Sequence, residues 1–196
     1  MRTLVVTGFS AFPGAPANPT ETLMRRLSRH APRLARLGWR LETRVLPVVY
    51  GETAKRLADI ERALAPDALL HFGLASRRRA ISVEQVARKR LCPLKVDAAR
   101  RASGATARGG PEFLQVRAPT ARIAAAIAAT GAPCALSMDA GGYVCNQTLY
   151  LSLAHSRAAR VGFVHVPRPM RVAGGLRGLE RAALAALFVL LRDAPR

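Results

Sequence analysis

Short apolar runs alternate with longer amphipathic segments along the chain, and this alternation constrains the fold more than any other feature. The runs with the composition of buried strands are Thr3–Thr7, Leu41–Val49, Ala68–Phe72, Pro133–Met138 and Val161–Val166. Helices are expected over 19–36, 52–64, 120–130, 146–158 and 176–191. Strands that alternate with helices are typical of α/β domains. We therefore predict a three-layer α/β/α sandwich with a mostly parallel central sheet.

The length of the chain fits one domain over residues 1–196, large enough to bury a core without disulfides or metal. The first predicted helix has a clear start, with Asn18 as cap and Pro19 in the first helical position. Between the third and fourth predicted strands, "AISVEQVA" alternates like a further strand. The polar, glycine-bearing run over 88–117 is expected to be a long excursion from the fold.

Cysteine usage and hydropathy indicate the cellular compartment in which the protein is expected. The three cysteines, Cys92, Cys134 and Cys145, are widely spaced and form neither a disulfide framework nor a C-x-x-C metal motif. Every apolar run falls far short of the ~20 residues that span a bilayer. The opening "MRTLVVTGF" has strand character and is too short for a signal segment. We expect a cytoplasmic protein without a membrane segment or a metal site.

The formal net charge of +19 raises the question of a nucleic-acid partner. Lys55, Lys89 and Lys95 are the only lysines, and the arginines that supply the remaining positive charge are spread over most segments. No zinc finger, helix-turn-helix spacing or aromatic RNA-binding motif accompanies them. The charge therefore predicts non-specific attraction to polyanions, and we do not expect a nucleic-acid function.

In open α/β folds, ligands bind beyond the carboxyl ends of the strands. The residues found there are the aromatic pair Phe9 and Phe12, then Leu74, the segment 139–145, and His165. One edge of the predicted sheet thus collects two aromatic rings, a cysteine and a histidine.

Cys145 stands at the start of a predicted helix, after the turn-forming Gly141 and Gly142. A helix N-terminus lowers a thiol pKa, and the unpaired backbone N–H groups of Cys145 and Asn146 are suited to hold an oxyanion. Most free cysteines are nevertheless buried hydrophobic residues. Residue types alone leave both interpretations of Cys145 open.

A thiol nucleophile needs a base, and His165 is the best placed of the four histidines. His155 is ten residues further along the same helix as Cys145, about 15 Å away. His30 falls in a solvated helix end, and His71 inside a strand suits a hydrogen-bonded structural role. A structural role for His165 itself stays open at this point.

A carboxylate that orients the imidazole would complete such a site. Glu84 stands alone in the apolar alternation of "ISVEQVA", where a carboxylate is otherwise unfavourable. Asp139 is the alternative, although its position beside two glycines also suits a turn residue. Composition does not decide between them.

Four motifs, "VTGFSAFPG…NPT", "HFGLASRRRAISVEQVA", "MDAGGYVCNQTLY" and "GFVHVP", resemble in order and spacing the signatures of the pyroglutamyl-peptidase I family. The resemblance spans about residues 3–190 and implies a three-layer α/β/α fold. It also implies a Cys–His–Glu triad that removes an N-terminal pyroglutamyl residue from small peptides with a blocked N-terminus, without a cofactor. The family often forms dimers or tetramers, so a homodimer or homotetramer is expected, with the 88–117 excursion as a natural contact surface.

The resemblance assigns roles to particular residues. It places the nucleophile at Cys145, the general base at His165 and the orienting acid at Glu84. The substrate-binding positions that it implies are Phe9 and Phe12 on either side of the pyrrolidone ring, Tyr143 and Val144 beside the nucleophile, and Asn18 and Leu74.

Several positions depart from the family pattern. The usual "GQAGGR" reads "GLASRR", so that Leu74 replaces a glutamine and Ser76 and Arg77 replace glycines. Arg90 is the candidate for an arginine that supports the oxyanion site in the family. These changes motivate two alternatives: a divergent triad hydrolase for another N-blocked or acyl substrate, and a basic, non-catalytic polyanion-binding protein.

Overall fold

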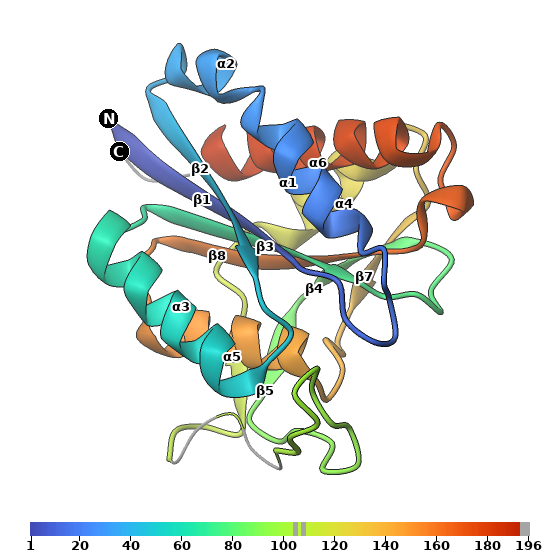
Figure 1. Cartoon of the computed structure of the whole chain (residues 1–196). Helices are drawn as coiled ribbons and strands as arrows, with labels where there is room; N and C mark the ends of the chain where they lie inside the picture. The colour runs from blue at the N-terminus through green and yellow to red at the C-terminus, as the bar shows by residue number, and fades with distance from the viewer. Residues whose placement is uncertain (104–105, 107–108, 193–196) are drawn as a thin grey trace.

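A six-stranded sheet lies between two layers of helices in the computed structural model, which describes residues 1–103, 106 and 109–192 (Figure 1). In spatial order the strands are β2 (Trp39–Leu46), β1 (Arg2–Phe9), β3 (Ala68–Leu74), β8 (Arg160–Val166), β4 (Ile81–Glu84) and β7 (Cys134–Ser137). The first four run parallel, whereas β4 is antiparallel to β8 and parallel to β7. The prediction of a three-layer α/β/α fold with a mostly parallel sheet is confirmed. The end of the predicted domain, at residue 196, lies outside the described residues.

The helices cover the sheet on both faces (Figure 1). One face carries α1 (Pro19–Ser28), α4 (Thr120–Ala128) and α6 (Gly175–Arg192), and the other carries α3 (Tyr50–Leu64) and α5 (Val144–His155). The short elements are α2 (Ala31–Ala35), the 3-10 turn η1 (Pro169–Arg171), and a two-stranded ribbon of β5 (Val86–Arg88) and β6 (Phe113–Gln115). Each face of the sheet therefore buries its own apolar core.

Proline explains two predicted boundaries that are wrong. The first predicted helix stops at Ser28 and a separate helix, α2, follows. Pro32 cannot lie inside a continuous helix because it lacks an N–H and its ring clashes with the preceding turn. The second predicted strand ends at Leu46, because Pro47 cannot donate to the sheet. The predicted cap is confirmed: the Asn18 side chain accepts from the N–H of Thr20 at 3.1 Å.

The segment "AISVEQVA" forms two strands in place of the one predicted. β4 joins the central sheet, and β5 leaves it to pair with β6 in the small ribbon. The predicted 88–117 excursion includes β6 and the last residue of β5, and residues 104–105 and 107–108 of it are outside the described residues.

Strand alternation places the candidate residues on one face. Val164 on β8 and Val83 on β4 belong to the core under α1, α4 and α6, so their neighbours His165 and Glu84 point to the opposite face, which α5 covers. Ser82 pairs with His165 in the sheet because β4 is antiparallel to β8. The short, reversed β4 therefore delivers Glu84 next to His165.

Candidate active site

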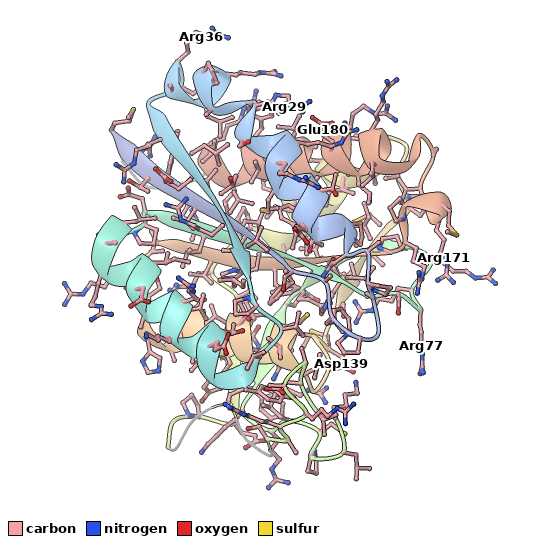
Figure 2. The ribbon with its side chains drawn as sticks, in the orientation of Figure 1. Arg29, Arg36, Arg77, Asp139, Arg171 and Glu180 are labelled. Carbon is pink, nitrogen blue, oxygen red and sulfur yellow. The ribbon has the colours of Figure 1, made fainter. Side chains whose placement is uncertain are left out.

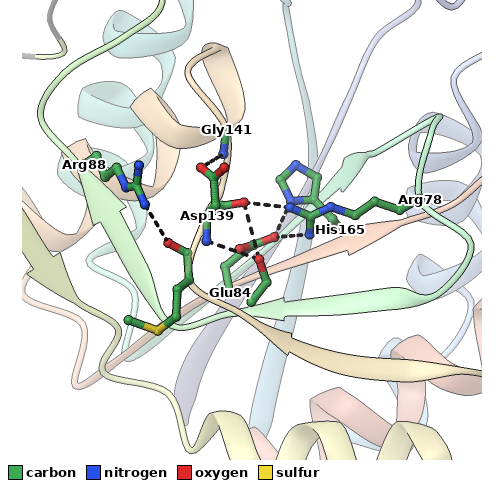
Figure 3. A network of polar contacts seen from close by, with 8 residues as sticks. Arg78, Glu84, Arg88, Asp139, Gly141 and His165 are labelled. Carbon is green, nitrogen blue, oxygen red and sulfur yellow. Dashed lines mark hydrogen bonds and ion pairs between the residues drawn. The ribbon is translucent and has the colours of Figure 1, made fainter.

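His165 and Glu84 form a buried pair. The Nδ1 atom of His165 lies 2.7 Å from Oε1 of Glu84, and the two residues are 5% and 0% exposed (Figure 3). A carboxylate only accepts hydrogen bonds, so Nδ1 carries the proton and Nε2 is left as the basic atom. The carboxylate thus fixes both the tautomer and the orientation of the imidazole.

Arg78 completes this network. Its Nη1 atom donates to the same Oε1 of Glu84 at 2.6 Å, and Nη2 donates to the carbonyl oxygen of Asp139 at 2.6 Å (Figure 3). A buried carboxylate is costly unless it is paired and hydrogen-bonded. Arg78 supplies that pairing and ties the loop after β3 to the loop before α5.

Cys145 is the second residue of α5 and lies above β3 and β8. A Cβ atom built on Gly73 would come within 2.9 Å of the Cys145 sulfur, and Gly73 is the register partner of His165. The absence of a side chain at Gly73 therefore makes room for the thiol directly beside the histidine.

The expected lowering of the Cys145 pKa by the helix N-terminus is wrong. Burial raises the pKa of this thiol to about 12, the negative charge of Glu84 adds to the rise, and the residue's own N–H, Lys95 and Arg78 only partly oppose it. The partial charge of the helix end is thus outweighed by desolvation. The thiol is protonated at rest and needs a base to become a nucleophile.

A cavity of about 720 Å³ opens above these groups. Its walls include the predicted site residues Phe12, Leu74, Tyr143, Cys145 and His165. The rings of Phe12 and Tyr143 lie 6.5 Å apart at an interplanar angle of 50°. The arrangement provides an apolar slot next to a thiol and an imidazole.

The other predicted site residues lie behind this wall. Phe9 is 2% exposed and packs on Phe163 with 6.3 Å between ring centroids, and Val144 is fully buried in the core. The Asn18 side chain donates to the carbonyl oxygen of Ser10, which holds the loop after β1. None of the three is among the residues that line the cavity.

Asn146 is also buried, and its side chain has a structural partner. Its Oδ1 accepts from the N–H of Arg88 at 2.8 Å, and its Nδ2 donates to the carbonyl oxygen of the same residue at 2.7 Å. These two bonds fasten β5 to α5. The backbone N–H of Asn146 belongs to the first turn of α5, where such groups lack helical partners.

The structure distinguishes the candidates that composition left open. Asp139 accepts the N–H of Gly141 at 2.9 Å through Oδ1, as expected of a turn residue, while Glu84 contacts His165 (Figure 3). Arg90 is exposed, lies 3.5 Å from Glu112 and does not line the cavity. Arg78 is the arginine at the site; sequence reasoning missed it, although it matches the arginine that ends the family's "GQAGGR".

The predicted structural role of His71 is confirmed. Its ring nitrogens contact Thr7 Oγ1 at 2.8 Å and Ser152 Oγ at 3.0 Å, and burial lowers its pKa to about 3. His30 differs from the expected solvated residue, since it is only partly exposed and lies 3.0 Å from Glu180.

No group of three or more His, Cys, Asp and Glu side chains in the described part of the chain is placed to hold a metal ion. None of the described helices is long and apolar enough to cross a membrane.

The fold and this site define a class: an α/β/α protein in which a thiol and a carboxylate-bound imidazole line one cavity, as in hydrolases with a nucleophilic cysteine. Comparison with known proteins narrows the class. Residues 1–177 match the family model described as pyroglutamyl peptidase. The chain therefore belongs to the pyroglutamyl peptidase family.

Individual relatives agree. The chain is 34% identical to pyrrolidone-carboxylate peptidase 1 of Ralstonia nicotianae over 89% of its own length and 82% of the relative's. It is 33% identical to the pyrrolidone-carboxylate peptidase of Pyrococcus furiosus, with 84% and 80% covered. The solved structure of pyrrolidone carboxyl peptidase from Thermus thermophilus superposes with a TM-score of 0.84 at 32% identity, covering 94% of this chain and 98% of that one.

Proposed function

We propose that the protein is a cysteine exopeptidase that removes an N-terminal pyroglutamyl residue from peptides, with Cys145 as nucleophile, His165 as general base and Glu84 as the orienting acid. The observation that carries the proposal is that the Cys145 thiol lies next to the strand of His165, that His165 is paired with Glu84, and that Cys145 and His165 line the same cavity. The family membership supplies the reaction type.

The reaction begins with proton transfer from Cys145 to Nε2 of His165 as the sulfur attacks the pyroglutamyl carbonyl carbon. A thiol with a pKa of about 12 is not ionised in advance, so transfer and attack proceed together. The carbonyl oxygen becomes an oxyanion, which the backbone N–H groups of Cys145 and Asn146 stabilise. Glu84 stabilises the imidazolium that forms.

The second half of the reaction reverses the proton's path. His165 gives its proton to the leaving amine, the C–N bond breaks, and a thioester links the pyroglutamyl group to Cys145. Water, deprotonated by His165, then attacks the thioester and releases pyroglutamate and the free thiol. Water is the only co-reactant, so no cofactor enters the scheme.

The cavity suits a flat, neutral lactam. Phe12 and Tyr143 present aromatic faces, and Leu74 contributes further apolar surface. A free N-terminal glutamate would have to place its charges against the rings of Phe12 and Tyr143, which cannot solvate them, and it would therefore be rejected. Leu74 stands where the family has a glutamine, so the ring loses a hydrogen-bonding partner there and binds more weakly.

We also propose a cytoplasmic location and a homodimer or homotetramer. The three cysteines are unpaired, which suits a reducing compartment. The 88–117 excursion exposes Leu94, Val96 and Phe113, whose apolar surface supports a role as a contact between subunits. Light scattering after size-exclusion chromatography measures the assembly directly, and a monomer at all concentrations would contradict it.

The experiment that tests the reaction is release of aminomethylcoumarin from its pyroglutamyl amide. We expect release by the native protein, none above background by Cys145→Ala, and full release by Cys134→Ala, a matched control at a partly buried cysteine on β7. Absence of release by the native protein would contradict the proposal.

Leu74 in the cavity wall supports one alternative, a hydrolase for a different N-blocked or acyl group. Labelling of Cys145 by an acyl-type electrophile, blocked in His165→Gln but without release from the pyroglutamyl amide, would favour it. Strongly salt-dependent RNA binding by an inactive protein would favour the polyanion-binding alternative.

A further inference from the structure

The catalytic cavity is lined by more positive charges than the His165–Glu84 pair binds. Among the described residues that line it, four are cationic, Arg77, Arg78, Lys95 and Arg100, and one is acidic, Asp97. Arg78 is already committed to Glu84. None of the other three forms a salt bridge with the catalytic residues in the described part of the chain.

Asp97 forms no salt bridge with these cations in the described part of the chain. Its carboxylate is 3% exposed and accepts three backbone N–H groups, those of Tyr50 at 3.1 Å, Ala99 at 2.9 Å and Arg101 at 2.9 Å. The oxygens of Asp97 are therefore occupied by hydrogen bonds to backbone groups, which order the loop around this residue. Within the described part of the chain, Arg77, Lys95 and Arg100 make no salt bridge, and all three are exposed.

Two of these cations stand on a loop that is fastened to the cavity wall. The hydroxyl of Tyr50 donates to the carbonyl oxygen of Lys95 at 3.3 Å, and the hydroxyl of Tyr143 donates to that of Val96 at 3.1 Å. Since Tyr143 itself lines the cavity, the backbone that carries Lys95 is held beside the substrate slot. The cationic groups are thus pre-positioned by the residues that form the pocket.

The backbone at Arg100 is unusual. Its φ of 61° lies in the left-handed region, which glycine and asparagine adopt more readily than arginine. Its N–H donates to the carbonyl oxygen of Asp97 at 3.0 Å and closes the turn. A cationic side chain therefore occupies a position that favours glycine on conformational grounds and that faces the cavity.

The path of a bound peptide connects these charges to the substrate. With the lactam ring in the slot beside Cys145, the rest of the peptide leaves through the open side of the cavity, at about 3.3–3.6 Å per extended residue. Lys95 and Arg100 line the cavity from the loop that Tyr143 holds. Arg77, which projects from the loop after β3 at the margin of the molecule, lines it as well (Figure 2).

We infer that this cavity selects pyroglutamyl peptides with an acidic residue directly after the pyroglutamyl group, and that Lys95 and Arg100, assisted by Arg77, determine this preference. The inference rests on the proposed function and adds its substrate class. Each contact between an exposed cation and a substrate carboxylate changes kcat/KM by a small factor, and the factors multiply.

The test compares three tetrapeptide amides, pyroglutamyl-Glu-Gly-Phe, pyroglutamyl-Gln-Gly-Phe and pyroglutamyl-Lys-Gly-Phe, with chromatographic measurement of the tripeptide released. Gln is the neutral isostere of Glu, so the Glu/Gln ratio of kcat/KM isolates the charge. We expect a ratio of about 5 at low ionic strength, a further drop for the Lys peptide, and a ratio approaching 1 in ~0.5 M NaCl.

Variants assign the effect to the loop. Arg100→Gly removes the charge and relieves the left-handed backbone, so a falling Glu/Gln ratio in this variant cannot be attributed to misfolding. The double variant Lys95→Glu, Arg100→Glu should invert the preference so that the Lys peptide is cleaved faster than the Glu peptide. Arg36→Gln, which changes the net charge by the same amount as Arg100→Gly but at the far end of the molecule, should leave the ratio unchanged (Figure 2).

The outcomes separate this inference from the proposed function. Cleavage of the Gln peptide with a Glu/Gln ratio of 1, unaffected by salt or by the loop variants, would overturn the inference and leave the peptidase activity standing. An equal fall of the ratio in Arg36→Gln would also overturn it, because the overall charge would then be the cause. Failure to cleave any of the three peptides would overturn both.

Discussion

Two buried histidines lie on neighbouring strands of the same sheet and contact the same phenylalanine, yet their surroundings differ in kind. The ring centroids of His71 and His165 are 6.0 Å and 4.7 Å from that of Phe163. His71 lies between two hydroxyl groups inside the protein, whereas His165 has a carboxylate on one side and a cavity on the other.

The difference shows what converts a buried histidine into a base. Burial between neutral partners holds His71 in its uncharged form, with a pKa lowered to about 3. At His165 the Glu84 carboxylate holds the ring through Nδ1, and the residue lines the cavity. Similar burial thus gives a structural residue in one place and a catalytic candidate in the other.

The same substitution at both histidines gives the strongest test of their different roles. His165→Gln should lower kcat/KM by about 10³–10⁴, since the thiol with its raised pKa loses its base. His71→Gln should cost about 2 kcal/mol of unfolding free energy through its two hydroxyl contacts. Steady-state kinetics normalised to the folded fraction measure the change in kcat/KM. Urea denaturation measures the change in unfolding free energy. A large kinetic loss in His71→Gln would contradict the division of roles.

The next largest effect concerns the acid. Glu84→Gln keeps the shape of the side chain but removes the charge that stabilises the imidazolium, so kcat should fall by about 10²–10³ with a much smaller change in KM. The pyroglutamyl coumarylamide assay measures both constants. Asp139→Asn is the matched control, because its Oδ1 accepts only a turn N–H and the asparagine oxygen can do the same. Equal losses in the two variants would contradict the assignment of Glu84.

His71 also predicts a pH dependence of stability. Its pKa is about 3 in the folded chain and about 6.5 when unfolded, so between these values the unfolded state binds the extra proton. Its contribution is fully present above pH ~6.5 and is lost as the pH falls toward 3. From pH 6.5 to pH 5 the loss is about 2 kcal/mol, at 1.36 kcal/mol per unit.

Urea denaturation at the two pH values measures this loss, and His71→Gln provides the reference, because glutamine does not titrate. The native protein should lose about 2 kcal/mol more than the variant over this interval. Equal pH dependence of the two proteins would contradict the lowered pKa, because it would mean that His71 binds a proton as readily in the folded as in the unfolded state.

The comparison also shows how far sequence reasoning reaches. The alternation of short apolar runs with amphipathic segments, separated by glycine and proline, predicts the sheet. The lone carboxylate in "ISVEQVA" points to Glu84. The antiparallel direction of β4 is set by long-range packing and leaves no local pattern. The helix start at Cys145 is visible in the sequence, but its desolvation is not, and desolvation reverses the direction of the pKa shift.

Arg78 illustrates the same limit, because a run of three arginines does not reveal which one turns inward. Arg77 and Arg79 are exposed, whereas Arg78 is partly buried and contacts Glu84. The choice depends on where the carbonyl oxygen of Asp139 lies, 61 residues away along the chain. A contact of this kind is visible only in three dimensions.

The smallest of the expected effects concerns Arg78, and it tests how far the Glu84 carboxylate depends on this partner to hold His165. Arg78→Lys keeps a positive charge but cannot donate to Glu84 and to the Asp139 carbonyl oxygen as a planar fork. We expect kcat to fall by about tenfold with KM nearly unchanged, because Glu84 then holds the imidazole less rigidly. Arg79→Lys, on the exposed neighbour, should show no change.

A purely structural role for Arg78 would instead lower stability without moving kcat per folded molecule. Steady-state kinetics together with thermal denaturation distinguish the two, since a positioning residue changes kcat at constant folded fraction. Partial recovery of kcat in Arg78→Lys relative to Arg78→Met would show that the charge contributes separately from the fork geometry. The His165–Glu84 pair would then depend on a third group that His71, between two neutral hydroxyls, does not need.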